Sequence, residues 1–126
     1  MTKSTHLLSW FLQLCIVALL APAAYFKLTD HPESIELFTD LDMEPTGRYV
    51  IGFLEAIACL LLLIPQAIIH GALLSLCVMM GAIIAHFTKL GFSEMFSFAP
   101  ILLVILAAVI IFLRRSQIKS IARMLD

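Results

Sequence analysis

Four long apolar runs, separated by short polar stretches, dominate the pattern of residues along this chain. They cover about residues 7–26, 46–64, 67–87 and 98–115. A helix needs about 20 predominantly apolar residues to cross the hydrocarbon core of a bilayer. The pattern therefore predicts a single four-span membrane domain over residues 1–126, with residues 116–126 as a C-terminal tail. Only Pro65 and Gln66 separate the second and third runs, which predicts an antiparallel hairpin.

A cleaved signal peptide is an alternative for the first run. Lys3 precedes a leucine-rich stretch that ends at Ala21-Pro22-Ala23, as in such a peptide. The apolar region of a signal peptide has about 7–15 residues, and this run is longer. We therefore expect a true first span, with Ser4 or Thr5 as the N-terminal cap of its helix.

The connection between the first two spans has a helical pattern of its own, over about residues 32–43. Apolar side chains recur there at helical spacing, at Ile35, Phe38 and Leu41. Pro32 suits a first helical turn, and Asp30 or His31 can cap it. The pattern predicts a short amphipathic helix that lies on the outer face of the bundle with its apolar stripe turned inward.

The composition agrees with a membrane protein. Hydrophobic residues make up 62% of the chain and charged residues 13%, and the mean hydropathy is +1.05. In soluble domains, hydrophobic residues make up about 45–50% of the chain and charged residues about 25%. The net charge of −1 argues against a nucleic-acid partner, which would require a basic face. We expect an all-α transmembrane four-helix bundle in a lipid bilayer, with the short amphipathic outer helix between spans one and two.

Lysine and arginine residues near the span ends predict the orientation of the bundle. Five lie on the side shared by both termini, namely Lys3, Arg114, Arg115, Lys119 and Arg123. The opposite side has three, namely Lys27, Arg48 and Lys89. Basic residues favour the cytoplasmic side. We therefore expect both termini in the cytoplasm and a location in the bacterial inner membrane.

Glu55 is the residue that a bilayer should exclude. It lies in the second span, seven residues past Arg48, which is about 10 Å deeper along a helix. A charge at this depth costs roughly 2.5–3.5 kcal/mol, so it implies a partner, a water-filled pocket or a bound proton. Gly52 lies between Arg48 and Glu55 on the same face and leaves space for an approaching group. Four other ionisable residues should lie at this end of the bundle: Lys27, Arg48, His86 and Lys89.

Two interpretations of this five-residue polar cluster stay open. In the structural one, Lys27, Arg48 and Lys89 reach the headgroups while Glu55 is paired to hold the helices together. In the functional one, Glu55 and His86 contact a ligand, because ionisable residues inside a membrane are rare and are usually functional.

Other kinds of site find little support in the residues. Cys15, Cys59 and Cys77 lie near the middle of three different spans without a Cys-x-x-Cys pair, which is typical of packing residues. The four histidines lie on both sides of the membrane without zinc-ligand spacing. No phosphate loop, nucleophile elbow or pair of catalytic carboxylates occurs. We assign no catalytic residue and no metal site.

An ordered set of motifs is similar to the DoxX-like family of small four-span membrane proteins, over nearly the whole chain. The motifs are Tyr25-Phe26-Lys27-Leu28, Ile35-Glu36-Leu37-Phe38 with Pro45, Ile51-Gly52-Phe53-Leu54-Glu55 with Pro65, Met79 to His86, and Pro100. Lys27, Glu55 and His86 match the polar motif positions of the family. Members of the family that the chain resembles have different functions. They include the membrane subunit of thiosulfate:quinone oxidoreductases, companions of oxidative-stress enzymes, and an assembly chaperone for acetylcholine receptors. The resemblance therefore implies a role of one of these kinds.

Three functional hypotheses follow. The first is a non-catalytic accessory or assembly subunit of a membrane complex, in which the outer helix and acidic loop between Lys27 and Arg48 engage a membrane-protein partner or a second copy. Small residues of the third span also permit close helix contact, namely Gly71, Ala72, Ser75, Gly81, Ala82 and Ala85. The second is a quinone-linked redox subunit, in which Glu55 and His86 bind a quinone and pass protons. The third is small-molecule binding or transport. It fits least well, because only Gln13, Ser75 and His70 continue a polar path inward.

Overall fold

The computed structural model describes residues 2–90 and 98–116, with only the backbone at residues 89 and 90. All regular structure in these residues is helical. The α-helices are α1 (Lys3–Leu28), α2 (Pro32–Asp40), α3 (Thr46–Leu63), α4 (Ile68–Ala85) and α5 (Ala99–Leu113). A 3₁₀ turn, η1 (Pro65–Ala67), precedes α4, and a π turn, η2 (His86–Leu90), follows it. The prediction of an all-α bundle is confirmed.

Three helical stretches of the described chain are long and apolar enough to cross a membrane: α1, α3 and the stretch Pro65–Thr88 that contains α4. The fourth apolar helix, α5, has 15 residues and is shorter. It begins one residue before Pro100, whose missing N–H leaves no bond unmade in a first turn. The N-terminal cap of α1 differs from the prediction: Thr2, not Ser4 or Thr5, accepts a hydrogen bond from the Thr5 N–H.

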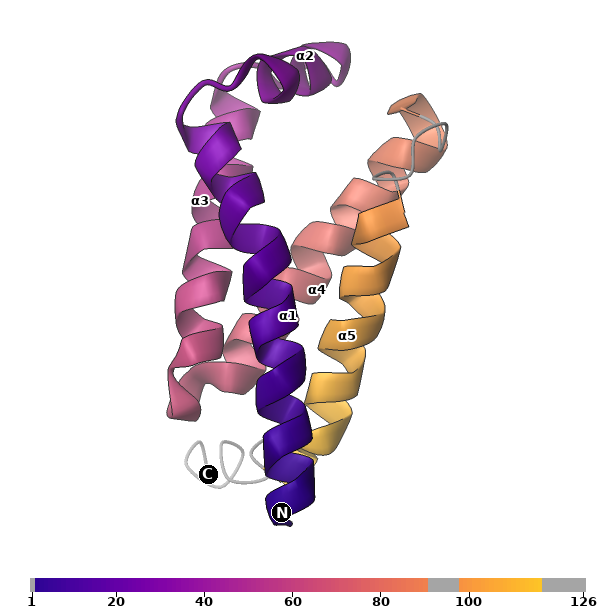
Figure 1. The fold of residues 1–126 in the computed structure, drawn as a ribbon. Helices are drawn as coiled ribbons and strands as arrows, with labels where there is room; N and C mark the ends of the chain where they lie inside the picture. Colours follow the sequence, from indigo (N-terminus) through magenta and orange to yellow (C-terminus); the bar gives the residue numbers. More distant parts are fainter. Residues whose placement is uncertain (1, 91–97, 117–126) are drawn as a thin grey trace, which may run out of the picture.

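The four long helices pack in a ring in which α1 contacts α3 and α5, and α4 contacts the same two helices. The predicted hairpin of the second and third spans is present as α3, η1 and α4. The start of α1 and the end of α5 lie at one end of the bundle, which we call the inner end, while α2 lies at the other, outer end (Figure 1). Towards the outer end, the pair α1–α3 diverges from the pair α4–α5 (Figure 1).

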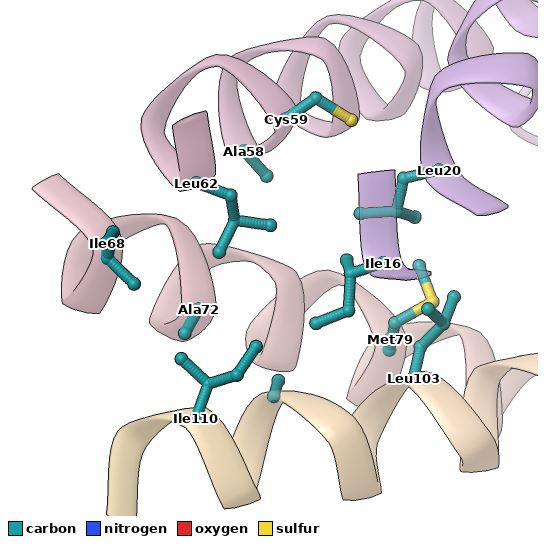
Figure 2. Close-up of a cluster of buried hydrophobic side chains, with 11 residues drawn as sticks. Ile16, Leu20, Ala58, Cys59, Leu62, Ile68, Ala72, Met79, Leu103 and Ile110 are labelled. Atoms are coloured by element: carbon teal, nitrogen blue, oxygen red, sulfur yellow. The ribbon is translucent and has the colours of Figure 1, made fainter. Parts of the chain in front are cut away.

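The apolar core lies where the four long helices meet (Figure 2). It contains Ile16 and Leu20 from α1, Ala58, Cys59 and Leu62 from α3, Ile68, Ala72 and Met79 from α4, and Leu103, Ala107 and Ile110 from α5. Gly71 brings α4 close to α3, because a Cβ there would lie 2.8 Å from the backbone nitrogen of Leu62. Cys59 is a buried packing residue, as expected, whereas Cys77 is exposed.

Helix α2 is the predicted amphipathic outer helix, although it ends at Asp40 rather than at residue 43. His31 caps it by accepting a hydrogen bond from the Glu33 N–H. Phe38 points inward and is 4% exposed, while the acidic side chains of the helix are exposed. Asp30 and Asp42, just outside the two ends, have left-handed backbone conformations that turn the chain.

Candidate functional site

The outer polar cluster is built on one face of α3. Arg48, Gly52 and Glu55 are all buried, as their spacing on one face predicts. Gly52 allows α1 to come close: a Cβ at this position would lie 2.9 Å from the Cβ of Lys27. The group that approaches over Gly52 is therefore the last turn of α1, which carries Lys27.

Lys27 and Glu55 form an ion pair between α1 and α3. The Lys27 Nζ lies 2.8 Å from the Glu55 Oε1, and the two side chains are 17% and 2% exposed. The groups meet through their charges, without the geometry of a directed hydrogen bond. A buried carboxylate needs such compensation, because desolvation of an unpaired charge is costly. Glu55 thus has the partner that its depth required.

Arg48 is the second centre of the outer cluster and joins three segments of the chain. Its Nη2 lies 2.7 Å from the Glu44 carboxylate and 2.8 Å from that of Asp30. Its Nη1 donates to the backbone carbonyl of Lys27. The guanidinium therefore connects the end of α1 and the segments on both sides of α2 to the start of α3. A planar guanidinium can make several such bonds at once.

Tyr49 completes this arrangement at the outer end of the bundle. Its ring lies under the Arg48 guanidinium, 4.3 Å from centroid to Cζ. Its hydroxyl donates a hydrogen bond to the Asp30 Oδ1. This bond, together with the bond from Arg48, holds the pKa of Asp30 below its ordinary value of 3.8. Asp30 is therefore ionised at neutral pH.

Of the other two residues of the predicted cluster, the structure describes the side chain of His86 alone. The His86 Nδ1 lies 2.8 Å from the backbone carbonyl of Ala82, one turn back on its own helix. The outer end of α4, which leads into His86, belongs to the helix pair that diverges from α1 and α3 (Figure 1). The Lys89 side chain lies outside the described residues. The structure thus brings together Lys27, Arg48 and Glu55.

The sequence interpretation missed three members of the outer cluster, namely Asp30, Glu44 and Tyr49. Glu44 could have been found, because it lies four residues before Arg48 and such pairs meet on a helical path. Asp30 has no comparable signal: its partners Arg48 and Tyr49 are distant in the sequence and meet it only through the tertiary fold.

A second polar cluster at the inner end was not predicted as a site. Ser9, Gln13 and Arg114 are 0%, 0% and 2% exposed. The Ser9 hydroxyl donates to the Gln13 Oε1 over 2.6 Å, and the Gln13 Nε2 donates to the Leu62 carbonyl over 2.9 Å. The Arg114 Nε donates to both Ser9 and Gln13. The spacing of Ser9 and Gln13 was a signal, but nothing local indicates that Arg114 is buried.

An apolar hollow of about 360 Å³ lies beside the outer cluster. Leu28, Tyr49, Val50, Phe53 and Leu54 line it. Tyr49 is shared by the hollow and the outer cluster, since its ring lines the hollow and its hydroxyl contacts Asp30. Across the described ranges, no three histidine, cysteine or acidic side chains lie together in a way that could hold a metal ion.

Comparison with known proteins gives one match. The model of the DoxX-like family matches residues 11–114. This range includes every residue of the two polar clusters except Ser9, and it begins after the start of α1. Searches of curated proteins and of solved structures found no match.

Proposed function

This chain belongs to the DoxX-like family, and from that premise we propose that it is a non-catalytic accessory or assembly subunit of a membrane complex. The ionisable groups of the outer cluster support a structural role. Lys27 is paired with Glu55, and Arg48 is paired with Asp30 and Glu44. These charges are used within the chain to connect α1, α2 and α3, so they hold the outer end of the protein in one shape.

The observation that carries the proposal is the outer half of α4. The buried residues of this helix end at Met79, although the helix continues to Ala85. Met80 and Ile84 are 47% and 59% exposed. A Cβ at Gly81 would meet nothing within 4 Å. Among the residues that the structure describes, this half of α4 therefore leaves a surface open for packing.

The occupant that we propose is a transmembrane helix of a partner protein. Gly81 and Ala85 are four residues apart, and small residues at this spacing let two helices approach closely in a membrane. At the same end of the bundle, Glu33, Glu36 and Asp40 are exposed on α2. These acidic side chains suit a partner with basic residues outside the membrane next to its helix.

The test is co-purification of the tagged full chain from membranes of its own source organism. Gly81→Leu adds a bulky side chain at a position where a Cβ meets no described atom within 4 Å, and Ala108→Leu enlarges an exposed position on α5 as the matched control. We expect a companion protein in a fixed ratio, retained by the control and lost from Gly81→Leu. A photo-crosslinker at position 81 identifies the companion. The proposal would be refuted if no companion protein co-purified in a fixed ratio, or if both variants retained the companion equally. A crosslink only to a second copy of this chain would show a homo-oligomer in place of a partner complex.

The orientation is part of the same proposal. We place the inner end, with the start of α1 and the end of α5, in the cytoplasm of a bacterial cell because of the basic residues counted near the span ends. Helix α2 and its acidic face would then lie on the periplasmic side. A reporter fused to the C-terminus should be active only in its cytoplasmic form, and periplasmic reporter activity would reverse this orientation.

A quinone-linked redox subunit is the second candidate, and the apolar hollow favours it. Its apolar lining suits a ring or isoprenoid tail. The Tyr49 hydroxyl donates its proton to Asp30, so its oxygen is left as an acceptor for a hydroxyl of the reduced quinol. Lipid extraction of the purified protein decides this candidate. It predicts quinone in a fixed ratio to the wild-type protein and a reduced ratio in Tyr49→Phe, whereas repeated absence of quinone rejects it.

A further inference from the structure

The Arg114 guanidinium is a buried charge whose partners are all neutral. The residue is 2% exposed and is the C-terminal cap of α5. Both of its side-chain hydrogen bonds to described residues leave from Nε, to the Ser9 Oγ over 2.6 Å and to the Gln13 Oε1 over 3.2 Å. Its Nη2 is buried without a hydrogen-bond partner in the part of the chain that the structure describes.

The neighbouring side chains cannot neutralise this charge. Ser9 donates its own proton to Gln13, and the Gln13 amide donates to the Leu62 carbonyl. The network therefore orients two neutral oxygens towards Nε but supplies no negative charge. The ion pairs of the described residues belong to Lys27 and Arg48, at the outer end. Buried charges in proteins are normally paired, and Arg114 has no anionic partner within the described ranges 2–90 and 98–116.

The C-terminal end of α5 compensates only part of the charge. A helix dipole is equivalent to about half a negative charge at this end, and it gives Nη2 no acceptor. Nη2 has no hydrogen-bond partner among the described residues, and the edge of a guanidinium that carries it has the geometry that binds two oxygens of one oxyanion. Because Nε is already held by Ser9 and Gln13, this edge is fixed in direction before any ligand arrives.

We propose that Arg114, held by Ser9 and Gln13, binds the oxyanion of a phosphate group at the inner end of the bundle. The surroundings favour phosphate, because exposed Arg115 follows directly and Lys3 begins α1 at the same end. Basic residues at a membrane surface concentrate anionic lipid headgroups and soluble phosphates. Phosphate from either source has the same chemistry for this guanidinium.

The test uses the purified full chain in a neutral detergent. Inorganic phosphate, phosphatidylglycerol and the phosphate-free control diacylglycerol are titrated separately, and binding is followed by native mass spectrometry and by the melting temperature. Arg114→Gln removes the guanidinium with its forked pair of terminal nitrogens. Arg115→Gln removes the exposed neighbouring charge and is the matched control. We expect saturable binding to the wild type and to Arg115→Gln. For Arg114→Gln it should be at least about tenfold weaker, the factor expected for a charge-assisted hydrogen bond.

The outcomes separate the sources of the phosphate. Binding of phosphatidylglycerol alone assigns the site to a lipid headgroup, and binding of inorganic phosphate alone assigns it to a soluble ligand. Arg114→Lys keeps the positive charge but loses the forked pair of nitrogens. It gives a second comparison if Arg114→Gln does not fold. We expect phosphate to bind Arg114→Lys more weakly than the wild type. Failure of both anions to bind the wild type, or equal binding by the wild type and the Arg114 variants, would overturn the proposal.

Discussion

The Lys27 ammonium lies 2.8 Å from the Glu55 carboxylate, in the interface where Gly52 lets α1 and α3 come together. The Glu55 side chain is 2% exposed, and Lys27 is the ion-pair partner that the described residues give it. The pair therefore links the stability of the α1–α3 interface to the state of a single buried charge.

Lys27→Met should destabilise the protein strongly. Removal of one partner of a buried ion pair leaves an uncompensated charge, which typically costs about 3–5 kcal/mol. The free energy of unfolding in detergent measures this loss. The double variant Lys27→Met/Glu55→Met should recover most of it, because both charges are gone. A double variant as unstable as the single one would show that the pair does not act through charge compensation.

Arg48→Gln should loosen helix α2 while the rest of the bundle stays intact. Arg48 bonds Asp30 and Glu44, which lie on either side of α2, so its loss releases both connections. Hydrogen bonds to a charged group contribute about 1.5–3 kcal/mol each, which corresponds to amide exchange roughly ten- to hundredfold faster in α2. Hydrogen exchange with mass spectrometry checks this. Exchange in the hairpin of α3 and α4 is the internal control, and an equal increase there would indicate global destabilisation instead.

Asp30 should make the stability of the outer end depend on acidic pH. Its pKa in the folded protein lies below its ordinary value of 3.8, because Tyr49 and then Arg48 bond to the ionised form. The carboxylate therefore stabilises the fold fully above about pH 3.8 and loses this effect as the pH falls through the lower folded pKa. The melting temperature of Asp30→Asn should lie below that of the wild type at neutral pH. The two should converge in acid, and a difference that is constant with pH would contradict this.

Two glycines of α4 should respond in opposite ways to alanine. A Cβ at Gly71 would lie 2.8 Å from the backbone nitrogen of Leu62, so Gly71→Ala should cost about 1–3 kcal/mol through overpacking. A Cβ at Gly81 would meet nothing, so Gly81→Ala should be neutral or stabilising by up to about 1 kcal/mol from helix propensity. Thermal unfolding of both variants checks the contrast. Equal losses at the two positions would mean that α4 is packed at its outer end as tightly as at its inner end.

The fold followed from the sequence because membrane insertion depends on local properties. The length and apolarity of each run predict a spanning helix, and a two-residue connection predicts a hairpin, without any knowledge of tertiary contacts. The amphipathic pattern around Phe38 likewise predicted α2 and its inward face. The exact ends were less predictable. Thr2 rather than Ser4 or Thr5 caps α1, because a cap depends on where the backbone leaves the helix.

The outer cluster was predictable only where one helix determines the geometry. Arg48, Gly52 and Glu55 share a face of α3 by helical spacing alone. Whether Lys27 or His86 approaches that face depends on how whole helices are inclined to one another. The pair α1–α3 stays together at the outer end while α4 diverges with α5 (Figure 1), so Lys27 meets Glu55.

The sequence by itself determined the class of the protein, its helices and the presence of an intramembrane acid that needs a partner. The tertiary structure decided which charges meet, because packing of distant segments sets the partner and the burial of each side chain. Arg114 shows this most clearly. In the sequence it is one more basic residue at the end of a span, and in the fold it is buried against Ser9 and Gln13 from the far end of the chain.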